Sequence, residues 1–383
     1  MPSPALKDYL DKMYYCMRCG FCRFACTTLS QRDMEETFSP RGRILLIRGL
    51  ATRELEASAH VADKIYFCTT CGYCHVKCPL GLEIDKIIEA ARYELVKVGI
   101  APPIAHKNVA SKIEEEDNPF GEPRNERVKW LELGNGSFPE KAEVLYWAGC
   151  MASYRTQETA IATVKILQNA GVDFTMLGTE EGCCGSVLLR TGQRELVEEK
   201  YARANVEKIS AKGVKTLVTA CAGCYRTFHE DYREILGNLP FKVLHISEYL
   251  ERLIKDGKVK FKKELPMKVT YHDPCHLGRH AGIYEPPRNV INAIPGLTLI
   301  EMTKNREESR CCGAGGGLRS AYQKQSVKIA ADRLELDALP TGAEVLITPC
   351  PFCVLSFKDA MSTFQMKIEI LDLVELVCKA LLF

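Results

Sequence analysis

AEVLYWAGC, residues 142–150, and MKVTYHDPC, residues 267–275, are two β-rich runs that each end in one cysteine. Three more pairs follow in the same order: DFTMLGTEEGCCG (173–185) with LTLIEMTKNREESRCCG (297–313), VKTLVTACAGC (214–224) with AEVLITPCPFC (343–353), and FKVLHISEYLERLI (241–254) with MKIEILDLVELVCKAL (366–381). Offsets of 125, 128 and 129 residues separate the three cysteine groups of the two copies. The chain therefore carries an internal duplication, and this duplication decides its fold.

Helical stretches lie between these predicted strands, among them ETAIATVKILQNAG and QKQSVKIAADRLEL, whose apolar residues recur at helical spacing. Alternating strands and helices predict two repeated α/β lobes with parallel sheets, over residues 141–256 and 257–383. Ligands of open α/β sheets bind at the carboxyl ends of the strands, where the cysteine groups of each lobe fall. We expect the five cysteines of a lobe to converge there. The first-lobe quintet is Cys150, Cys183, Cys184, Cys221 and Cys224, and the second-lobe quintet is Cys275, Cys311, Cys312, Cys350 and Cys353.

The amino-terminal part carries a second cysteine pattern, C-x2-C-x2-C-x3-C, which occurs twice. In two-cluster ferredoxins this run supplies three thiolates to one [4Fe-4S] cubane and the fourth to the other. The pattern predicts a first ferredoxin set of Cys16, Cys19, Cys22 and Cys78, and a second ferredoxin set of Cys26, Cys68, Cys71 and Cys74. Thr27 stands where the pattern usually has proline, but proline is not a ligand, so we expect cluster binding to survive.

The segments SPRGRILLIRGL (39–50) and RELEASAHVADKIYFC (53–68) separate the two motifs and read as helices. Residues 1–98 therefore resemble the α-helical ferredoxin domain of multi-subunit oxidoreductases more than a small β-rich ferredoxin. Residues 99–140 contain five prolines and an acidic run, and they predict a linker with some local helix.

Composition excludes several classes of function. The chain has 383 residues, of which 26% are charged, and its formal charge of +2 gives no reason to expect a nucleic-acid partner. No apolar run approaches the roughly 20 residues needed to span a bilayer, and MPSPALKDYLDKMYYC lacks a signal core. We expect a cytoplasmic protein, peripheral on the inner membrane face only where a partner holds it there.

Other interpretations of the cysteines and their neighbours are weaker. Disulfides do not suit gaps of two and three residues, and structural zinc sites need only four thiolates each.

The glycines of CCGAGGG (311–317) permit close approach of backbone to a cluster or ligand, but no lysine and Ser/Thr pair follows for a phosphate loop. His272, His276 and His280 surround Cys275; each is most simply a satisfied polar residue, with His276 a candidate for touching substrate. Cys378 belongs to no motif and reads as a small buried hydrophobe.

The two quintets, C-x32-CCG-x35-C-x2-C and C-x35-CCG-x36-C-x2-C, resemble the paired CCG domains of heterodisulfide reductase. An α-helical ferredoxin domain ahead of two such lobes is similar to the D-type subunit of that enzyme. The same architecture occurs in iron–sulfur subunits of glycerol-3-phosphate, glycolate and lactate dehydrogenases. The resemblance implies one noncubane [4Fe-4S] cluster per lobe, in addition to the two ferredoxin cubanes, and both quintets are complete.

The resemblance also implies a function in anaerobic metabolism. Electrons from a partner, which is a flavoprotein, a cytochrome b or another iron–sulfur protein, would pass through the cubanes to two noncubane clusters that split a small-molecule disulfide between the lobes. Opening a disulfide needs two electrons, so both quintets are expected to be catalytic. The alternative is an electron-relay subunit between a flavin dehydrogenase and a quinone or cytochrome. The chain has neither C-x-x-C-H nor G-x-G-x-x-G after a strand, so its own haem or flavin site is not expected.

Overall fold

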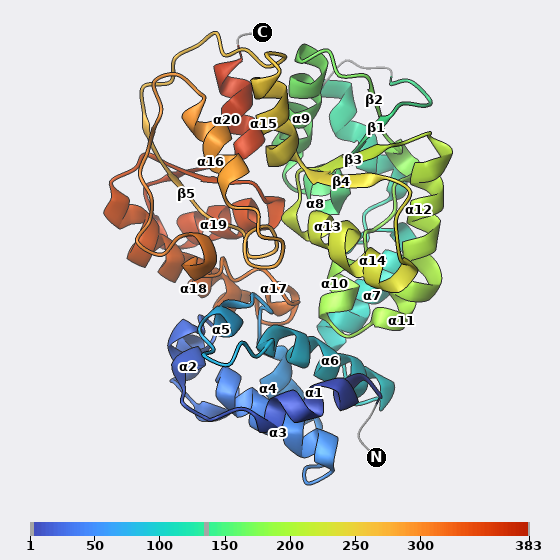
Figure 1. Cartoon of the computed structure of the whole chain (residues 1–383), viewed down its shortest axis with the longest axis vertical. Helices are drawn as coiled ribbons and strands as arrows, with labels where there is room; N and C mark the ends of the chain where they lie inside the picture. The colour runs from blue at the N-terminus through green and yellow to red at the C-terminus, as the bar shows by residue number, and fades with distance from the viewer. Residues whose placement is uncertain (1–3, 134–137, 382–383) are drawn as a thin grey trace.

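Three bodies make up the chain in the computed structural model, which describes residues 4–133 and 138–381. Figure 1 shows the helical amino-terminal part in blue at the bottom, below two α/β lobes that lie side by side, the first in green and yellow and the second in orange and red. The predicted fold class, a helical ferredoxin domain followed by two repeated α/β lobes with parallel sheets, is confirmed.

The amino-terminal part is entirely helical in its regular structure. Its α-helices are α1 (Pro4–Tyr14), α2 (Phe21–Ala25), α3 (Pro40–Thr52), α4 (Ala59–Tyr66), α5 (Tyr73–Val76) and α6 (Ile84–Lys97). Ser39 caps α3 by accepting a hydrogen bond from the Gly42 N–H, and Ser58 caps α4 in the same way. The helix predicted over residues 53–68 begins only at Ala59, because Arg53 adopts a left-handed conformation that ends α3.

The segment expected as a linker is built into the structure. Helix α7 (Ile104–Glu116) and the 3-10 helix η3 (Arg124–Leu133) follow the cis peptide bond before Pro102. The buried His106 ring of α7 hydrogen-bonds to the Gly317 carbonyl of the second lobe at 2.8 Å, and the Tyr201 hydroxyl of the first lobe donates to the Ile113 carbonyl at 3.0 Å. Helix α7 therefore contacts both lobes.

Each lobe contains a four-stranded, all-parallel sheet, as the duplication predicts. The strand orders, β2-β1-β3-β4 and β6-β5-β7-β8, are the same. The first sheet comprises β1 (Val144–Trp147), β2 (Phe174–Thr175), β3 (Thr216–Thr219) and β4 (Lys242–His245), and the second β5 (Lys268–Tyr271), β6 (Thr298–Leu299), β7 (Val345–Thr348) and β8 (Glu369–Asp372). In register, Val144 pairs with Thr216 and Val269 pairs with Val345.

Helices cover both sheets. The first lobe has α8 (Gly149–Tyr154), α9 (Gln157–Asn169), α10 (Ser186–Arg190), α11 (Arg194–Leu196), α12 (Ala202–Ala211), α13 (Ala222–Arg226), α14 (Tyr232–Leu236) and α15 (Ile246–Lys255). The second has α16 (Glu285–Asn292), α17 (Leu318–Ala321), α18 (Gln323–Arg333), α19 (Pro351–Phe364) and α20 (Leu373–Ala380). The two stretches predicted as helices from their apolar spacing are α9 and α18.

The lobes join through a shared hydrophobic core. Helix α9 packs on α20, and α15 packs on α16. Because α9 corresponds to α16 in the repeat, and α15 to α20, a pseudo-twofold axis relates these two contacts. Buried residues of both sheets, such as Tyr146 and Tyr271, belong to one apolar cluster. Cys378, on α20, is partly buried against this cluster, in agreement with its interpretation as a small hydrophobe.

Candidate iron–sulfur centres

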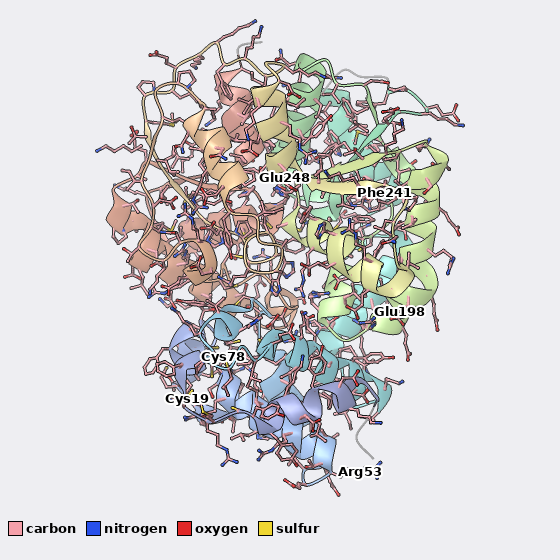
Figure 2. The ribbon with its side chains drawn as sticks, viewed as in Figure 1. Cys19, Arg53, Cys78, Glu198, Phe241 and Glu248 are labelled. Carbon is pink, nitrogen blue, oxygen red and sulfur yellow. The ribbon has the colours of Figure 1, made fainter. Side chains whose placement is uncertain are left out.

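The ferredoxin cysteines gather in two cavities. Cys16, Cys19, Cys22 and Cys78 line one cavity, and Cys26, Cys68, Cys71 and Cys74 line the other. The structure thus brings together the two crossed sets that the motif predicts. Figure 2 shows Cys19 and Cys78 on the same side of the amino-terminal part.

Matching backbone turns place the thiols of the two motifs. Arg18 and Thr70, each just before the second cysteine of its motif, have positive φ angles of 57° and 49°. Gly20 and Gly72, each just after that cysteine, also have positive φ, 86° and 73°. Non-glycine residues adopt this conformation rarely and at a cost, so its recurrence at equivalent positions indicates a loop shaped for ligation.

The electrostatics of these cavities fit a cationic centre. Burial, with the neighbouring thiols as the next cause, raises the pKa of the Cys22 thiol to about 12. Four thiolates gathered at one cavity are therefore unfavourable unless a cation compensates them, and iron would provide that charge. The Arg43 guanidinium lies 3.9 Å from the Cys26 Sγ and adds positive charge at the second cavity.

The quintets also converge. In the first lobe Cys150 neighbours Cys183, and Cys224 contacts both Cys184 and Cys221 through side-chain hydrogen bonds. All five of these residues are buried. The Gly149 φ of +76° allows this approach, because a Cβ there would lie 3.1 Å from the Cys224 Sγ.

The second lobe repeats the arrangement. Cys311 contacts Cys275 and Cys312, the Cys353 Sγ lies 3.2 Å from the Cys312 Sγ, and Cys353 also contacts Cys350. Only Cys275 of this quintet is partly exposed. Five soft thiols joined by a series of contacts are more than a single zinc ion takes, and their number fits an iron–sulfur cluster.

Two thiol contacts connect the centres to one another, and the sequence did not reveal them. Cys71 of the second ferredoxin set hydrogen-bonds to Cys311 of the second lobe. Cys221 of the first lobe hydrogen-bonds to Cys350 of the second. These contacts connect the second ferredoxin set, the second lobe and the first lobe in that order. Cys26 of the second ferredoxin set is among the neighbours that raise the pKa of Cys22 in the first set, so the first set stands at the other end of this row.

A cavity of about 490 Å³ opens between the lobes, where a cleft was expected. Its walls include four cysteines of the second quintet: Cys275, Cys312, Cys350 and Cys353. Ser186, Ala222 and Gly223 of the first lobe face them, and His276 lines the same space. Lys112, Arg190 and Arg319 also line it, and no carboxylate stands among the described lining residues. Glu89 and Asp231 pair with Arg190, and Asp359 pairs with Arg319, so Lys112 is the one of these three cations for which the described residues provide no ion pair, and it favours an anionic ligand.

The glycines of CCGAGGG were expected to allow close approach to a cluster or ligand, and the neighbours that the structure gives to Gly315, Gly316 and Gly317 include atoms of the ferredoxin domain and of α7. A Cβ on Gly316 would lie 2.4 Å from the Cys68 carbonyl oxygen, and one on Gly317 would lie 2.5 Å from the His106 Nε2. Both glycines also line the cavity between the lobes. The run therefore fits the second lobe against the loop that carries the second ferredoxin set.

Arg92 was not identified from the sequence. Its buried guanidinium on α6 donates to five carbonyl oxygens, those of Ile65, Tyr66, Cys68, Arg190 and Gly316. These carbonyls belong to the ferredoxin domain and to both lobes. A single arginine in an amphipathic helix carries no signal of such a role, because its partners lie up to 224 residues away.

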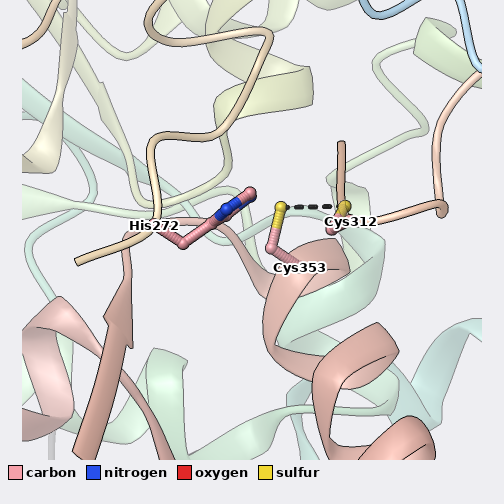
Figure 3. A group of neighbouring side chains, drawn as sticks. All are labelled: His272, Cys312 and Cys353. Atoms are coloured by element: carbon pink, nitrogen blue, oxygen red, sulfur yellow. Dashed lines mark hydrogen bonds between the residues drawn. The ribbon is translucent and has the colours of Figure 1, made fainter. Parts of the chain in front are cut away.

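His272 lies closer to the candidate ligands than the sequence indicated. Among the residues that the structure describes, the one compact group of potential metal ligands is His272, Cys312 and Cys353, whose ligand atoms lie within 4.8 Å of one another (Figure 3). Burial lowers the pKa of the His272 ring, and Cys312 hydrogen-bonds to it. The ring has hydrogen-bond partners, as its interpretation as a satisfied polar residue expects, and one of them is a candidate ligand.

Comparison with known proteins agrees with this geometry. The family described as "4Fe-4S dicluster domain" matches residues 12–82, and the family described as "Cysteine-rich domain" matches residues 144–229 and 269–358. The fold and the sites define an iron–sulfur protein with one dicluster domain and two cysteine-rich domains.

The chain is 39% identical to the D-type subunit of "Dihydromethanophenazine:CoB--CoM heterodisulfide reductase" from Methanosarcina acetivorans, over 96% of this chain and 93% of that protein. It belongs to the family of heterodisulfide reductase D-type subunits, as the resemblance predicted, and is an iron–sulfur subunit of a heterodisulfide reductase-like oxidoreductase. It is also 31% identical to "EtfAB:quinone oxidoreductase" of Syntrophomonas wolfei, over 98% of this chain and 59% of that protein. A crystal structure of a hypothetical protein from Helicobacter pylori shares the fold, with a TM-score of 0.64 at 13% identity over 98% of this chain and 75% of that one.

The crossed arrangement of the ferredoxin sets gives a first prediction. Cys26→Ser is expected to remove the cluster of the second ferredoxin set, with a loss of about four iron atoms per chain, and to leave the cluster of the first set intact. Iron analysis and electron paramagnetic resonance of the anaerobically purified variant measure this. Loss of the signal of the first set instead would contradict the crossed assignment.

Proposed function

We propose that this chain passes electrons through two ferredoxin cubanes to two noncubane [4Fe-4S] clusters, which reduce a disulfide bound between the lobes. The observation that carries this proposal is the cavity between the lobes, with four cysteines of the second quintet on its walls. A subunit that only relayed electrons would have no need of a ligand-sized cavity at its innermost centres.

The ligands that we assign are the eighteen cysteines of the four sets. Residues 1–98 would form the ferredoxin domain, 99–140 a connecting segment, and 141–256 and 257–383 the two CCG domains. The convergence of each set supports this assignment.

The row of centres supplies a path for the electrons. Cys19, in the first ferredoxin set, is exposed, and the exposed side chains of Tyr15, Met17, Phe21 and Phe24 lie near it in the sequence. Aromatic and methionine side chains are enriched at protein interfaces, so we place the partner subunit here.

From the second ferredoxin set the path continues by the Cys71–Cys311 contact into the second lobe, and by the Cys350–Cys221 contact into the first.

The overall reaction consumes two electrons and two protons and converts one disulfide into two thiols. Iron–sulfur clusters supply electrons singly, so the second-lobe centre at the cavity and the first-lobe centre, reached through the Cys221–Cys350 contact, would provide the required pair. Lys112 would bind an anionic group of the substrate. Burial, with Arg226 as the next cause, holds the pKa of His276 well below its usual range, so this ring would meet the substrate as a neutral hydrogen-bonding group.

The printed name of the M. acetivorans relative suggests the first substrate to test, the CoB–CoM heterodisulfide. The name of the S. wolfei relative suggests the competing function, relay to a quinone. Among the described residues no helix is both long and apolar enough to cross a membrane. In either function we expect a partner subunit to connect this chain with the donor or the quinone.

The experiment is reduction of the CoB–CoM heterodisulfide by an artificial one-electron donor, with protein whose loading is verified as about sixteen iron atoms per chain. Turnover is expected, and it should weaken as salt is added, because Lys112 would attract the anionic substrate. Lys112→Met, at the cavity, is expected to raise KM with little change in kcat. Fully loaded protein without activity toward this or another anionic disulfide would exclude the reductase and favour relay.

A further inference from the structure

The second-lobe quintet has a histidine neighbour whose orientation is fixed by an arginine. The Arg333 Nε–H donates to the His272 Nδ1 at 3.4 Å. Arginine has no acceptor, so the Nδ1 must present its lone pair, and the ring proton of the neutral imidazole then lies on Nε2. The ring is therefore a donor at Nε2, and a ring nitrogen of His272 lies within 4.8 Å of the Cys312 and Cys353 Sγ atoms.

The Arg333 side chain is itself held firmly. It is fully buried, its Nη1 lies 2.7 Å from an Asp337 carboxylate oxygen, and its Nη2 donates to the Lys304 carbonyl and the Ser309 hydroxyl. Asp337 also pairs with Arg310, at 3.1 Å, so it is shared between two guanidinium groups. The direct contact of Arg333 with the ring fixes the tautomer and orientation of His272. Outer residues of metal sites commonly act in this way.

The first lobe lacks this arrangement at the equivalent positions. Trp147 ends β1 where His272 follows β5, and Asn205 occupies the position that Arg333 has in the second copy. Asn205 donates to the Cys183 carbonyl and the Tyr232 hydroxyl, so it supports the backbone. The repeat has thus placed an imidazole and an arginine at one lobe only.

We propose that His272, held by Arg333, donates its Nε2–H to the Cys312 thiolate and raises the reduction potential of the second-lobe cluster. A hydrogen bond to a cluster sulfur withdraws electron density and stabilises the reduced state, which carries more negative charge. This inference rests on the proposed function, because it takes the quintets as cluster ligands. Since Cys71 contacts the same quintet through Cys311, a raised potential would draw electrons out of the ferredoxin domain.

The test is a redox titration of the loaded protein followed by electron paramagnetic resonance, without substrate. His272→Ala is expected to keep all of its iron and to shift the reduction equilibrium of the second-lobe cluster about tenfold toward the oxidised state, which is about 59 mV for one electron. The conservative His272→Gln, which retains an N–H donor, should recover part of this shift. The cubane potentials should not change. Trp147→Phe is the matched control, because it alters the first lobe and should leave the second-lobe potential as it is.

Two results would overturn the inference and leave the proposed function standing. One is an unchanged second-lobe potential in fully loaded His272→Ala protein, and the other is loss of about four iron atoms, which would make His272 a ligand. If His272→Ala does not fold, nitrogen and proton couplings measured by electron paramagnetic resonance on wild-type protein labelled with ¹⁵N-histidine decide whether His272 donates a hydrogen bond to the cluster. A weak nitrogen coupling together with an exchangeable proton at the second-lobe cluster supports the hydrogen bond. A strong coupling from an iron–nitrogen bond, or no coupling, overturns it.

Discussion

Cys312→Ser is expected to abolish turnover of the disulfide while both ferredoxin cubanes remain reducible. The Cys312 Sγ stands at the centre of the second quintet, 3.2 Å from that of Cys353, and it lines the cavity between the lobes. A two-electron cleavage shared by two clusters cannot proceed at one of them. The loss should exceed the roughly 10- to 100-fold that changes outside the ligand shell cost at metal sites.

Cys184→Ser tests the same idea in the first lobe, since Cys184 occupies the position of Cys312 in the repeat. Both variants should lose about four iron atoms. Cys378→Ser is the matched control, because this cysteine lies outside all four sets and should retain full iron and activity. If either quintet variant kept much of its turnover, the two-cluster mechanism would be wrong and a bypassable relay would be the better account.

Arg92→Met is expected to have the largest effect on stability. Methionine fills much of the same space but leaves five buried carbonyl oxygens without their shared donor. Buried acceptors that lose a charged donor cost about 1–3 kcal/mol each, so a loss of at least about 3 kcal/mol in the free energy of unfolding is expected after relaxation. Because the carbonyls come from three bodies, the packing of the ferredoxin domain against the lobes should also loosen.

Thermal and denaturant unfolding of the loaded protein, together with limited proteolysis of residues 99–140, would measure this. Arg203→Met is a suitable control, since Arg203 is exposed on α12 and its loss should change stability by no more than about 0.5 kcal/mol. An equally small change for Arg92→Met would show that water or neighbouring donors satisfy the carbonyls, and that Arg92 does not hold the three bodies together.

The apolar spacing of a sequence does not predict where each helix begins and ends. The apolar spacing of residues 53–68 predicts one helix, but the first six residues are not helical. The left-handed Arg53 and the Ser58 cap decide that boundary, and neither changes the spacing of apolar residues. The helix and strand periods elsewhere were sufficient to predict α9, α18 and both sheets, because these elements bury one regular face.

The sequence by itself determined the cysteine sets, the duplication and the architecture, because ligand spacing and strand order are local properties that repeat along the chain. Only the tertiary structure decided how the centres connect. The Cys71–Cys311 and Cys221–Cys350 contacts, the five carbonyls of Arg92 and the approach of His272 to Cys312 all join residues that are distant in the chain. Such contacts depend on how complete helices and strands pack against one another, and no local sequence pattern determines this packing.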